Sequence, residues 1–317
     1  MADVEQKDTV IVGGGPGGYV AAIRASELGQ KVTLIEKGEP GLGGVCLNVG
    51  CVPSKALIAA GHRLQQAKDS STYGISKTDA SIDFAKTQDW KQHKVVDRMT
   101  RGVEMLLKKH KVEIIDGEAV MDSDSQLRVM KTGPKQFMDN DNGRVIKWNN
   151  LILATGSRPV EIKGFKFEGR VIDSTGGLNL LEIPKEFVVI GGGYIGTELA
   201  GAYADLGSHV TILEGTGSIL NGFDKDMVKV VEKNLKKKGI DIVTNAMAKS
   251  SSQDDKSVTV NYEVDGKEQS LTADYCMVSV GRKPNTDNFG LEMTSVKLDD
   301  HGKVVVDKQG KTSVDHI

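Results

Sequence analysis

The pattern of apolar and polar positions along this chain contains one long segment twice. Residues 10–36 read VIVGGGPGGYVAAIRASELGQKVTLIE, and residues 188–214 read VVIGGGYIGTELAGAYADLGSHVTILE, and the two align without a gap. Each has a short apolar run, a glycine turn, apolar residues at helical spacing, and a second apolar run that ends in glutamate. Each copy therefore predicts a strand, a helix and a second strand. The repeat predicts two domains of related α/β fold.

The rest of the chain predicts a helical region, a small sheet and two buried strands. Residues 53–115 are mostly helical in pattern, with a break near 70–81, and residues 118–148 are typical of a meander of short strands. The segments LILATG (151–156) and CMVSVG (276–281) resemble each other, and an arginine and a proline follow each of them. We expect the chain to leave its two α/β domains at these strands. The lysine-rich segment 229–238 predicts an amphipathic helix with a solvated face.

Both glycine turns have the spacing of a dinucleotide-binding fingerprint. The motifs, each with the glutamate that ends the next strand, are Gly13-x-Gly15-x-x-Gly18 with Glu36 and Gly191-x-Gly193-x-x-Gly196 with Glu214. The glycines allow a tight turn, close approach of the backbone to a pyrophosphate and close packing of helix on strand. The pyrophosphate lies at the helix N-terminus, where unpaired N–H groups favour an anion. Two sites imply that electrons pass between two cofactors, and the residues alone leave open which site holds which nucleotide.

The glutamate at the end of the second copy indicates which nicotinamide nucleotide is preferred. A carboxylate there accepts hydrogen bonds from a ribose diol and repels a 2′-phosphate. The residues after Glu214 are Gly215 and Thr216, and neither supplies the arginine that would bind such a phosphate. We therefore expect NAD rather than NADP at one of the two sites.

The composition limits which kinds of partner and which cellular compartment we expect. The 317 residues include 41 basic and 43 acidic side chains, a formal net charge of −2, which argues against a nucleic acid or an anionic membrane as the main partner. No apolar run approaches the roughly 20 residues of a membrane span. The N-terminus has no signal-peptide pattern. We therefore expect a cytoplasmic protein, in which structural disulfides are rare.

Two of the three cysteines, Cys46 and Cys51, form a candidate redox pair after a glycine-rich stretch. Pro53 suits the first turn of a helix. Cys51 is then close to a helix N-terminus, which favours a thiolate, and Lys55 adds positive charge one turn later. Such a pair can exchange with another dithiol. No further cysteine or histidine cluster offers metal ligands, so we expect no metal site. Cys276 lies in an apolar strand and is expected in the core.

The segment GGVCLNVGCVPSK (43–55) strongly resembles the active-site segment of the dihydrolipoamide dehydrogenases, which are flavoproteins of the 2-oxoacid dehydrogenase complexes in the pyridine nucleotide-disulphide oxidoreductase family. The resemblance covers nearly the whole chain and includes ATG at 154–156 and GRKPNT at 281–286. The cysteine segment is specific for the superfamily and less decisive among its members. Mercuric reductases carry a similar stretch, whereas glutathione reductases usually have lysine where Ser54 stands.

This resemblance implies roles for individual residues. It assigns FAD to the first fingerprint with Glu36, and NAD to the second with Glu214. Cys46 would be the thiol that the substrate attacks, and Cys51 the thiol beside the flavin. The other implied site residues are Lys55, near flavin N5 and paired with Glu198; the backbone around Ala119, near the adenine of FAD; Tyr194, over the nicotinamide pocket; Gly281, near NAD; and Thr155, Gly156 and Arg282 as further cofactor contacts.

The implied reaction is the FAD-dependent oxidation of dihydrolipoamide to lipoamide, with reduction of NAD⁺ to NADH. Dihydrolipoamide, carried on a lipoyl domain, would attack the Cys46–Cys51 disulfide, form a mixed disulfide at Cys46 and leave as the cyclic disulfide. Cys51 would pass the electrons to the flavin, and the flavin would reduce NAD⁺. The implied partners are a 2-oxoacid dehydrogenase complex and, for the full-length protein, a second copy in a homodimer.

The resemblance also implies the domain order, with two Rossmann-like domains and the NAD domain inserted in the FAD domain. We expect residues 1–157 to form the FAD-binding domain with the cysteine pair, 158–283 the NAD-binding domain, and 284–317 the start of the segment that returns to the FAD domain. The family pattern continues past Ile317 into a second flavin motif. It then continues into a C-terminal interface domain that supplies dimer contacts and an acid–base histidine. We therefore expect a C-terminally truncated chain that turns over poorly, and none of its six histidines is expected to be that base.

Two other functions fit the same residues. Another flavin-dependent disulfide reductase, such as a mercuric reductase, would carry the same fingerprints and cysteine pair. A non-catalytic nucleotide-binding fragment would bind nucleotide without thiol chemistry. An absorbance spectrum before and after reduction, followed by an assay with dihydrolipoamide, separates the three.

Overall fold

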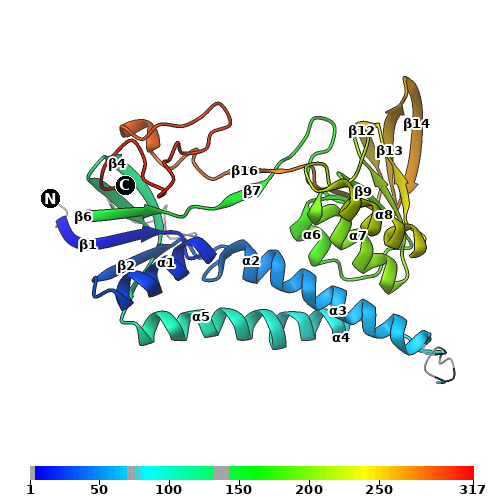
Figure 1. Ribbon diagram of the computed structural model, residues 1–317, viewed down its shortest axis with the longest axis horizontal. Coiled ribbons are helices and arrows are strands. Elements are labelled where there is room, and N and C mark those ends of the chain that lie inside the picture. The colour runs from blue at the N-terminus through cyan, green and yellow to red at the C-terminus, as the bar shows by residue number, and fades with distance from the viewer. Residues whose placement is uncertain (1–3, 70, 72–73, 75, 77–78, 132–142) are drawn as a thin grey trace. The chain divides into compact units, whose positions relative to one another are not determined.

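The computed structural model describes residues 4–69, 71, 74, 76, 79–131 and 143–317 (Figure 1). The protein is α/β, as predicted, and the chain divides into two compact units. Unit 1 consists of Met1–Asn48, Val96–Arg158 and Lys283–Ile317, and unit 2 consists of Val49–Val95 and Pro159–Arg282. Each unit is therefore built from segments that are distant in the sequence.

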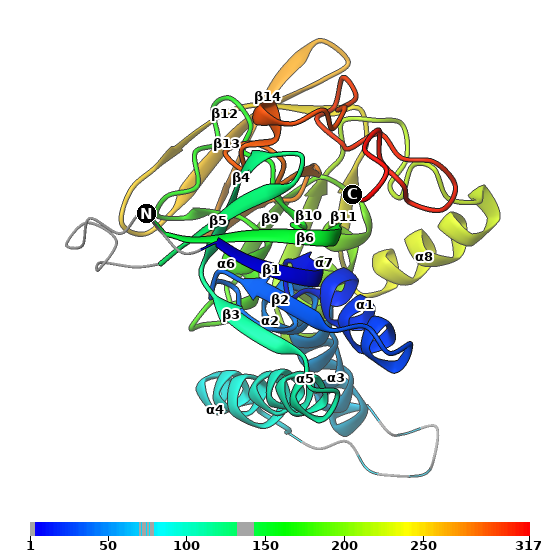
Figure 2. The same ribbon diagram turned by 90° about the vertical axis from the view of Figure 1, so that its left-hand side faces the viewer.

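Unit 1 contains a six-stranded sheet in the order β3-β2-β1-β6-β5-β4. Its strands are β1 (Val4–Val12), β2 (Val32–Glu36), β3 (Glu113–Asp116), β4 (Glu118–Ser123), β5 (Gln126–Met130) and β6 (Arg144–Leu153). The first four in this order run parallel, whereas β5 and β4 are antiparallel. Helix α1 (Pro16–Glu27) connects β1 to β2 and lies beside them in Figure 2, so the first predicted strand–helix–strand copy is confirmed.

The last strand of this sheet, β6, is longer than the sequence pattern indicated. It pairs with β1 along its whole length and with β5 at its start. The expectation of a meander that ends near Trp148 and a separate strand from Leu151 was therefore wrong, because one strand covers both. The exposed side chains of Asn149 and Asn150 interrupt the apolar pattern while their backbone stays in the sheet. The stretch 132–142 of the expected meander lies outside the described residues.

The final segment of the chain packs on the sheet of unit 1. Phe289, Val314 and Ile317 lie in one core cluster with the sheet residues. The Met121 N–H donates to the carbonyl of Phe289 at 2.9 Å, and the Leu151 N–H donates to the carbonyl of His316 at 2.8 Å. The remaining helices of this unit are α2 (Gly44–Val49), which continues one residue past its boundary, α5 (Asp97–Lys109) and the short 3₁₀ helix η4 (Leu291–Met293).

Unit 2 contains a five-stranded parallel sheet in the order β11-β10-β9-β15-β8 and a three-stranded antiparallel sheet in the order β12-β13-β14. Its strands are β8 (Val171–Ile172), β9 (Glu186–Ile190), β10 (His209–Leu213), β11 (Asp241–Val243), β12 (Ala246–Gln253), β13 (Val258–Val264), β14 (Lys267–Ala273) and β15 (Tyr275–Val278). Helix α7 (Tyr194–Leu206) connects β9 to β10 and confirms the second predicted copy. Helix α6 is Ser174–Leu178, and the predicted lysine-rich helix is α8 (Lys225–Lys237).

The helical region before α5 consists of α3 (Cys51–Lys68), α4 (Phe84–Trp90) and the π-helix η2 (Lys91–Val96), as the pattern predicted, but the last residues of the expected region, 113–115, belong to the strand β3. Helix α3 packs on α7 in unit 2. A Cβ on Gly61 would lie 2.8 Å from the Cβ of Asp205, and Gln65 donates to the carbonyl of Asp205 at 2.5 Å. Because of this packing, residues 49–95 group with unit 2, whereas the expected domain bounds place them with the first fingerprint.

The two predicted exits precede the places where the chain passes between the units. Strand β7 (Ser157–Pro159) follows β6, and strand β16 (Arg282–Pro284) follows β15. The two short strands pair with each other.

The helical stretch Gly44–Lys68 is long and apolar enough to cross a membrane, by length and composition only, with a mean hydropathy of 1.3 over an 18-residue window within it. This corrects the expectation that no apolar run approaches that length. Core helices of folded domains pass the same test. Helix α3 buries Leu57 and Leu64 in the packed interior, and we interpret it as such a helix.

Candidate nucleotide-binding and redox site

The first glycine turn joins β1 to α1 and has no room for a side chain at Gly13 or Gly18. Gly13 has a φ of +104°, and a Cβ there would lie 2.2 Å from the carbonyl oxygen of Ala154. A Cβ on Gly18 would lie 1.6 Å from the carbonyl oxygen of Gly13, so only glycine allows α1 to approach β1 this closely. Gly15 is the N-cap of α1 and offers no side-chain acceptor to the first turn. The arrangement leaves a helix N-terminus that suits an anion.

The second glycine turn, between β9 and α7, repeats this geometry. A Cβ on Gly191, which has a φ of +102°, would lie 2.7 Å from the carbonyl oxygen of Ser279. A Cβ on Gly196 would lie 2.0 Å from the carbonyl oxygen of Gly191. A Cβ on Gly193, in contrast, would meet no atom within 4 Å. The motif brings the backbone at this position close to a pyrophosphate, so the open space lies where a ligand is expected.

The glutamates that end the second strands contact their own glycine turns. Glu36 accepts a hydrogen bond from the Gly14 N–H and another, at 2.9 Å, from the Lys37 N–H. Glu214 accepts a hydrogen bond from the Gly192 N–H at 2.7 Å. The same contact occurs in both copies, so each carboxylate lies beside the turn that would hold the pyrophosphate.

Two residues that the sequence interpretation did not single out, Arg158 and Asn285, hold the turn after β6 in place. Asn285 donates from its side chain to the carbonyl of Thr155 at 2.9 Å and from its backbone N–H to the carbonyl of Gly156 at 3.0 Å. Arg158 donates to the Asn285 side chain at 3.0 Å and pairs with Asp287, and this pairing lowers the pKa of the Asp287 carboxyl. The signal in the sequence was the repeated arginine–proline after each exit strand.

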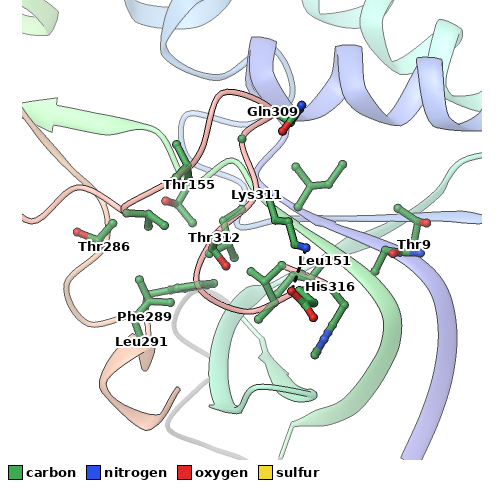
Figure 3. A pocket seen from close by; sticks show the side chains of 18 of the residues that line it. Thr9, Leu151, Thr155, Thr286, Phe289, Leu291, Gln309, Lys311, Thr312 and His316 are labelled. Atoms are coloured by element: carbon green, nitrogen blue, oxygen red, sulfur yellow. Dashed lines mark ion pairs between the residues drawn. The ribbon is translucent and has the colours of Figure 1, made fainter. Parts of the chain in front are cut away.

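A cavity of about 540 Å³ lies in unit 1 beside this turn. Its lining includes Leu151 and Thr155 from the β6 side, and Lys311, Thr312 and His316 from the final segment (Figure 3). A nitrogen of the His316 ring lies 2.7 Å from the carbonyl oxygen of Asp124, outside the lining. His316 therefore has a protein partner, and the expectation that it is not an acid–base group stays a prediction.

The predicted nicotinamide-side residues Tyr194, Gly281 and Arg282 all belong to unit 2. Tyr194 is the first residue of α7 and is exposed. Gly281 has a φ of +147° and no atom within 4 Å of an added Cβ. Burial lowers the pKa of the Arg282 guanidinium, while Tyr194 and Asp173 act in the opposite direction. On the other side, the predicted adenine contact Ala119 is buried in β4 of unit 1. Whether these residues touch cofactor stays a prediction.

The three cysteines lie in different surroundings. Cys46 is half-buried in α2, and Cys51 is exposed as the first residue of α3. The predicted helix start beside Cys51 is therefore present. Cys276 is fully buried in β15, and burial raises the pKa of its thiol, in agreement with its expected place in the core.

The helix that carries Cys46 begins directly on the first glycine turn. The Gly43 N–H donates to the carbonyl of Gly14 at 2.8 Å. Gly44 has a φ of +56°, and a Cβ there would lie 2.5 Å from the Cα of Gly15. Only glycine at position 44 permits this backbone contact. The candidate thiol and the candidate pyrophosphate site are thus parts of one local structure.

One turn after Cys51, Lys55 forms an ion pair with Glu198 of α7. The Lys55 Nζ lies 2.8 Å from Oε1 and 2.6 Å from Oε2 of Glu198. The predicted pairing of these two residues is therefore present in the structure.

Among the described residues, no group of three or more histidine, cysteine, aspartate or glutamate side chains could hold a metal ion.

Comparisons with known proteins agree with this arrangement. The family model described as pyridine nucleotide-disulphide oxidoreductase matches residues 7–317. Dihydrolipoyl dehydrogenases from Geobacillus stearothermophilus and Bacillus subtilis are 54% and 51% identical over 98% of this chain, and the chain spans 64% of the length of these relatives. The solved Cu(II) complex of the HOCl-induced flavoprotein disulfide reductase RclA from Escherichia coli superposes with a TM-score of 0.83 at 29% identity. That superposition covers 99% of this chain and 65% of the other.

The matching family model spans both glycine turns, which share one geometry and each have their own glutamate. It also spans the cysteine helix that begins on the first turn. The chain belongs to the pyridine nucleotide-disulphide oxidoreductase family.

Proposed function

We propose that this protein is a flavin- and NAD-dependent disulfide reductase of the dihydrolipoyl dehydrogenase type, which oxidises a dihydrolipoyl group and reduces NAD⁺. The observation that carries the proposal is the contact between Gly44 and Gly15, which places the cysteine helix on the first glycine turn. The substrate class is supported by the relatives named dihydrolipoyl dehydrogenase, which are 51–54% identical to this chain.

FAD binds the first fingerprint and NAD binds the second. The residues fit both groups, because each turn is a cradle that a Cβ would fill and each carboxylate is beside it. The FAD-holding residues are Gly13, Gly15, Gly18, Glu36, Ala119, Thr155 and Gly156, and the NAD-holding residues are Gly191, Gly193, Tyr194, Gly196, Glu214, Gly281 and Arg282. When bound, the flavin would supply a two-electron carrier between the dithiol and NAD⁺.

Cys46 and Cys51 form the disulfide that the substrate reduces. A thiolate of the dihydrolipoyl group attacks the Cys46 Sγ, the bond between the two cysteines breaks, and Cys51 leaves as a thiolate. The second substrate thiol attacks the substrate sulfur bound to Cys46, so that the cyclic disulfide leaves and Cys46 carries the electron pair. The substrate has then lost two electrons to the cysteine pair and two protons to solvent, and both cysteines are reduced.

Lys55 and Glu198 support the thiolate end of this pair. Lys55 lies one turn beyond Cys51 on α3, and its contact with both oxygens of Glu198 fixes the position of its charge. A fixed cation beside a helix N-terminus stabilises an anionic thiolate and the negative charge that accumulates on reduction.

The carrier of the substrate, in this proposal, is a lipoyl domain of a 2-oxoacid dehydrogenase complex in the cytoplasm, and a second copy of the chain is a further partner. The net charge of −2 fits a protein partner better than a nucleic acid.

The test is anaerobic reduction of the flavin-loaded protein by dihydrolipoamide, followed by absorbance, in the wild type, Cys46→Ser and Cys51→Ser. We expect the wild type to be reduced and both variants to lose dithiol-dependent reduction. Cys276→Ala is the control and should keep it, because Cys276 lies in the core of unit 2. Full reduction of Cys51→Ser would contradict the scheme.

The same experiment separates the other functions. Reduction by NADH but not by dihydrolipoamide would indicate another disulfide reductase of the family. Nucleotide binding with no redox chemistry from either side would indicate a binding module.

A further inference from the structure

We infer that Thr216 is a specificity-determining residue, which makes the second fingerprint select NAD over NADP by holding Glu214 in a single position. The inference rests on the proposed assignment of a nicotinamide nucleotide to that fingerprint. It adds a residue outside the glycine motif, on the loop after β10.

The carboxylate of Glu214 has three donors around it. Its Oε2 accepts from the Gly192 N–H at 2.7 Å. Its Oε1 accepts from Thr216 twice, from the backbone N–H at 2.8 Å and from the hydroxyl at 2.8 Å. The hydroxyl also lies 3.0 Å from the carbonyl of Ser218, but it carries one proton, and the charged acceptor at shorter distance is the stronger one.

Thr216 is itself anchored, so it can act as a fixed point. Its carbonyl accepts from the Asn245 N–H at 2.9 Å. On the same loop, the Glu214 N–H donates to the carbonyl of Val243 at 2.9 Å, and the Ala246 N–H donates to the carbonyl of Glu214 at 2.8 Å. These bonds tie the loop to the turn between β11 and β12. A rotation of the Glu214 side chain would therefore break the Thr216 contact and could not carry Thr216 along.

The first fingerprint provides an internal comparison. There the carboxylate of Glu36 accepts from the backbone N–H groups of Gly14 and Lys37. The residue that aligns with Thr216 is Gly38, which has no hydroxyl to offer. The side-chain clamp is thus a property of the second copy, which is the copy proposed to discriminate between nucleotides that differ by a 2′-phosphate.

A carboxylate that is held in one position can accept a hydrogen bond from a ribose diol, and it repels a 2′-phosphate. A carboxylate offers about four lone-pair sites, and the three protein donors leave room on Oε2 for a ribose hydroxyl. A 2′-phosphate carries about −1.5 to −2 charges at pH 7. It would be tolerated only if the carboxylate could swing away, because the repulsion falls with distance. The Thr216 hydroxyl opposes that movement.

The experiment compares wild type, Thr216→Val, Thr216→Ser and Ser218→Ala by fluorescence titration with NADH and with NADPH, which needs no turnover. Valine keeps the branched shape and removes the hydroxyl, whereas serine keeps the hydroxyl. Ser218 is the matched control, because its hydroxyl donates to the carbonyl of Ile219 and not to Glu214. Unfolding midpoints check each variant, and Thr216→Ala is a second hydroxyl-free variant at this exposed position.

We expect the ratio of the NADPH and NADH dissociation constants to fall by about threefold to tenfold in both hydroxyl-free variants, which corresponds to one charge-assisted hydrogen bond. The ratio should stay within about twofold of the wild type in Thr216→Ser and Ser218→Ala. An unchanged ratio in Thr216→Val and Thr216→Ala, with NADH still bound, would overturn the inference alone. A wild type that binds neither nucleotide would overturn the proposed function and this inference with it.

Discussion

Lys55 and Glu198, which are 143 residues apart in the sequence, form an ion pair in which the lysine Nζ contacts both carboxylate oxygens. The pair joins α3, one turn after Cys51, to α7, one turn after that helix begins at Tyr194. Its two side chains are 59% and 40% exposed, so the pair itself adds less than about 1 kcal/mol to the free energy of unfolding. Its main effect is therefore expected on the chemistry.

The first prediction follows from this exposure. Glu198→Gln should change the free energy of unfolding by less than about 1 kcal/mol. It should lower the rate of flavin reduction by dihydrolipoamide by about tenfold or more, because Lys55 loses the anion that positions it. Stopped-flow absorbance and urea unfolding measure the two effects. Lys229→Met, which removes an exposed ion pair with Asp226, is the control and should alter neither quantity. An unchanged rate in Glu198→Gln would exclude a role for the pair.

A second prediction separates two glycines of one motif. Gly196→Ala should lower the free energy of unfolding by about 2–4 kcal/mol, since its Cβ would lie 2.0 Å from a backbone oxygen. Gly193→Ala should change it by less than about 1 kcal/mol, because its Cβ meets no atom of the chain within 4 Å and its φ is −72°. Gly193→Ala should nevertheless weaken NADH binding at least about tenfold, because the new methyl fills the pyrophosphate position. Urea unfolding and NADH fluorescence provide the two readouts, and normal NADH affinity in Gly193→Ala would count against the nucleotide site.

The third prediction concerns a buried lysine in η2. Lys91 is 2% exposed, and its Nζ donates to the carbonyl of Leu178 and to the Asn179 side chain. Burial lowers its pKa to about 8 from the ordinary 10.5. Between these two values the unfolded chain binds a proton that the folded protein lacks, so stability should rise with pH across this window.

Unfolding titrations of wild type and Lys91→Met at pH 7.5 and pH 10.5 test this. The wild type should gain about 1–3 kcal/mol relative to the variant over that interval. The variant serves as its own reference, because all other titrating groups are shared. A difference between the two proteins that does not depend on pH would show that Lys91 stays protonated.

The fourth prediction concerns a histidine whose contribution to stability falls, rather than rises, with increasing pH. His209 of β10 lies between Glu186 and Asp241, at 2.7 Å and 3.0 Å from its two ring nitrogens. The hydrogen bond to Glu186, with that to Asp241, raises its pKa above 6.5. Its contribution is therefore fully present below pH 6.5 and is lost as the pH rises through the folded value. His209→Asn should lower the free energy of unfolding by up to about 1 kcal/mol at pH 5.5 and by close to nothing at pH 9. The effect at pH 5.5 is small because the ring is half exposed. Equal costs at the two pH values would contradict this reading.

The repeated strand–helix–strand units could be predicted because their signals are local. The spacing of apolar residues defines the strands and helices, and the glycines are required by contacts within a few residues, as at Gly13 and Gly18. The pairing of Lys55 with Glu198 was anticipated only through the family resemblance. The two residues lie on helices whose packing depends on Gly61 and Asp205, and no short-range pattern reports that packing.

The same reasoning explains what the sequence did not predict. The strand β6 continues through two solvent-facing asparagines, because its backbone pairs with β1 throughout. The contacts of Asn285 with Thr155 and Gly156 join residues about 130 positions apart, and the motifs that contain them do not indicate that they contact each other. The hydroxyl of Thr216 contacts Glu214 because the loop after β10 turns back on that carboxylate, and no sequence pattern indicates this turn.

Because Gly44 contacts Gly15, the first glycine motif and the cysteine helix cannot be transferred to another protein independently of each other. A cysteine helix grafted onto another glycine turn would need a glycine at the position of Gly44 and a connecting loop of matching length. Conversely, any residue but glycine at position 44 would push the thiol away from the turn. The fingerprint and the start of the redox segment therefore form a single transferable module, and a search for unrecognised relatives, or a design that borrows the Cys46 thiol, should treat residues 13–48 as one piece.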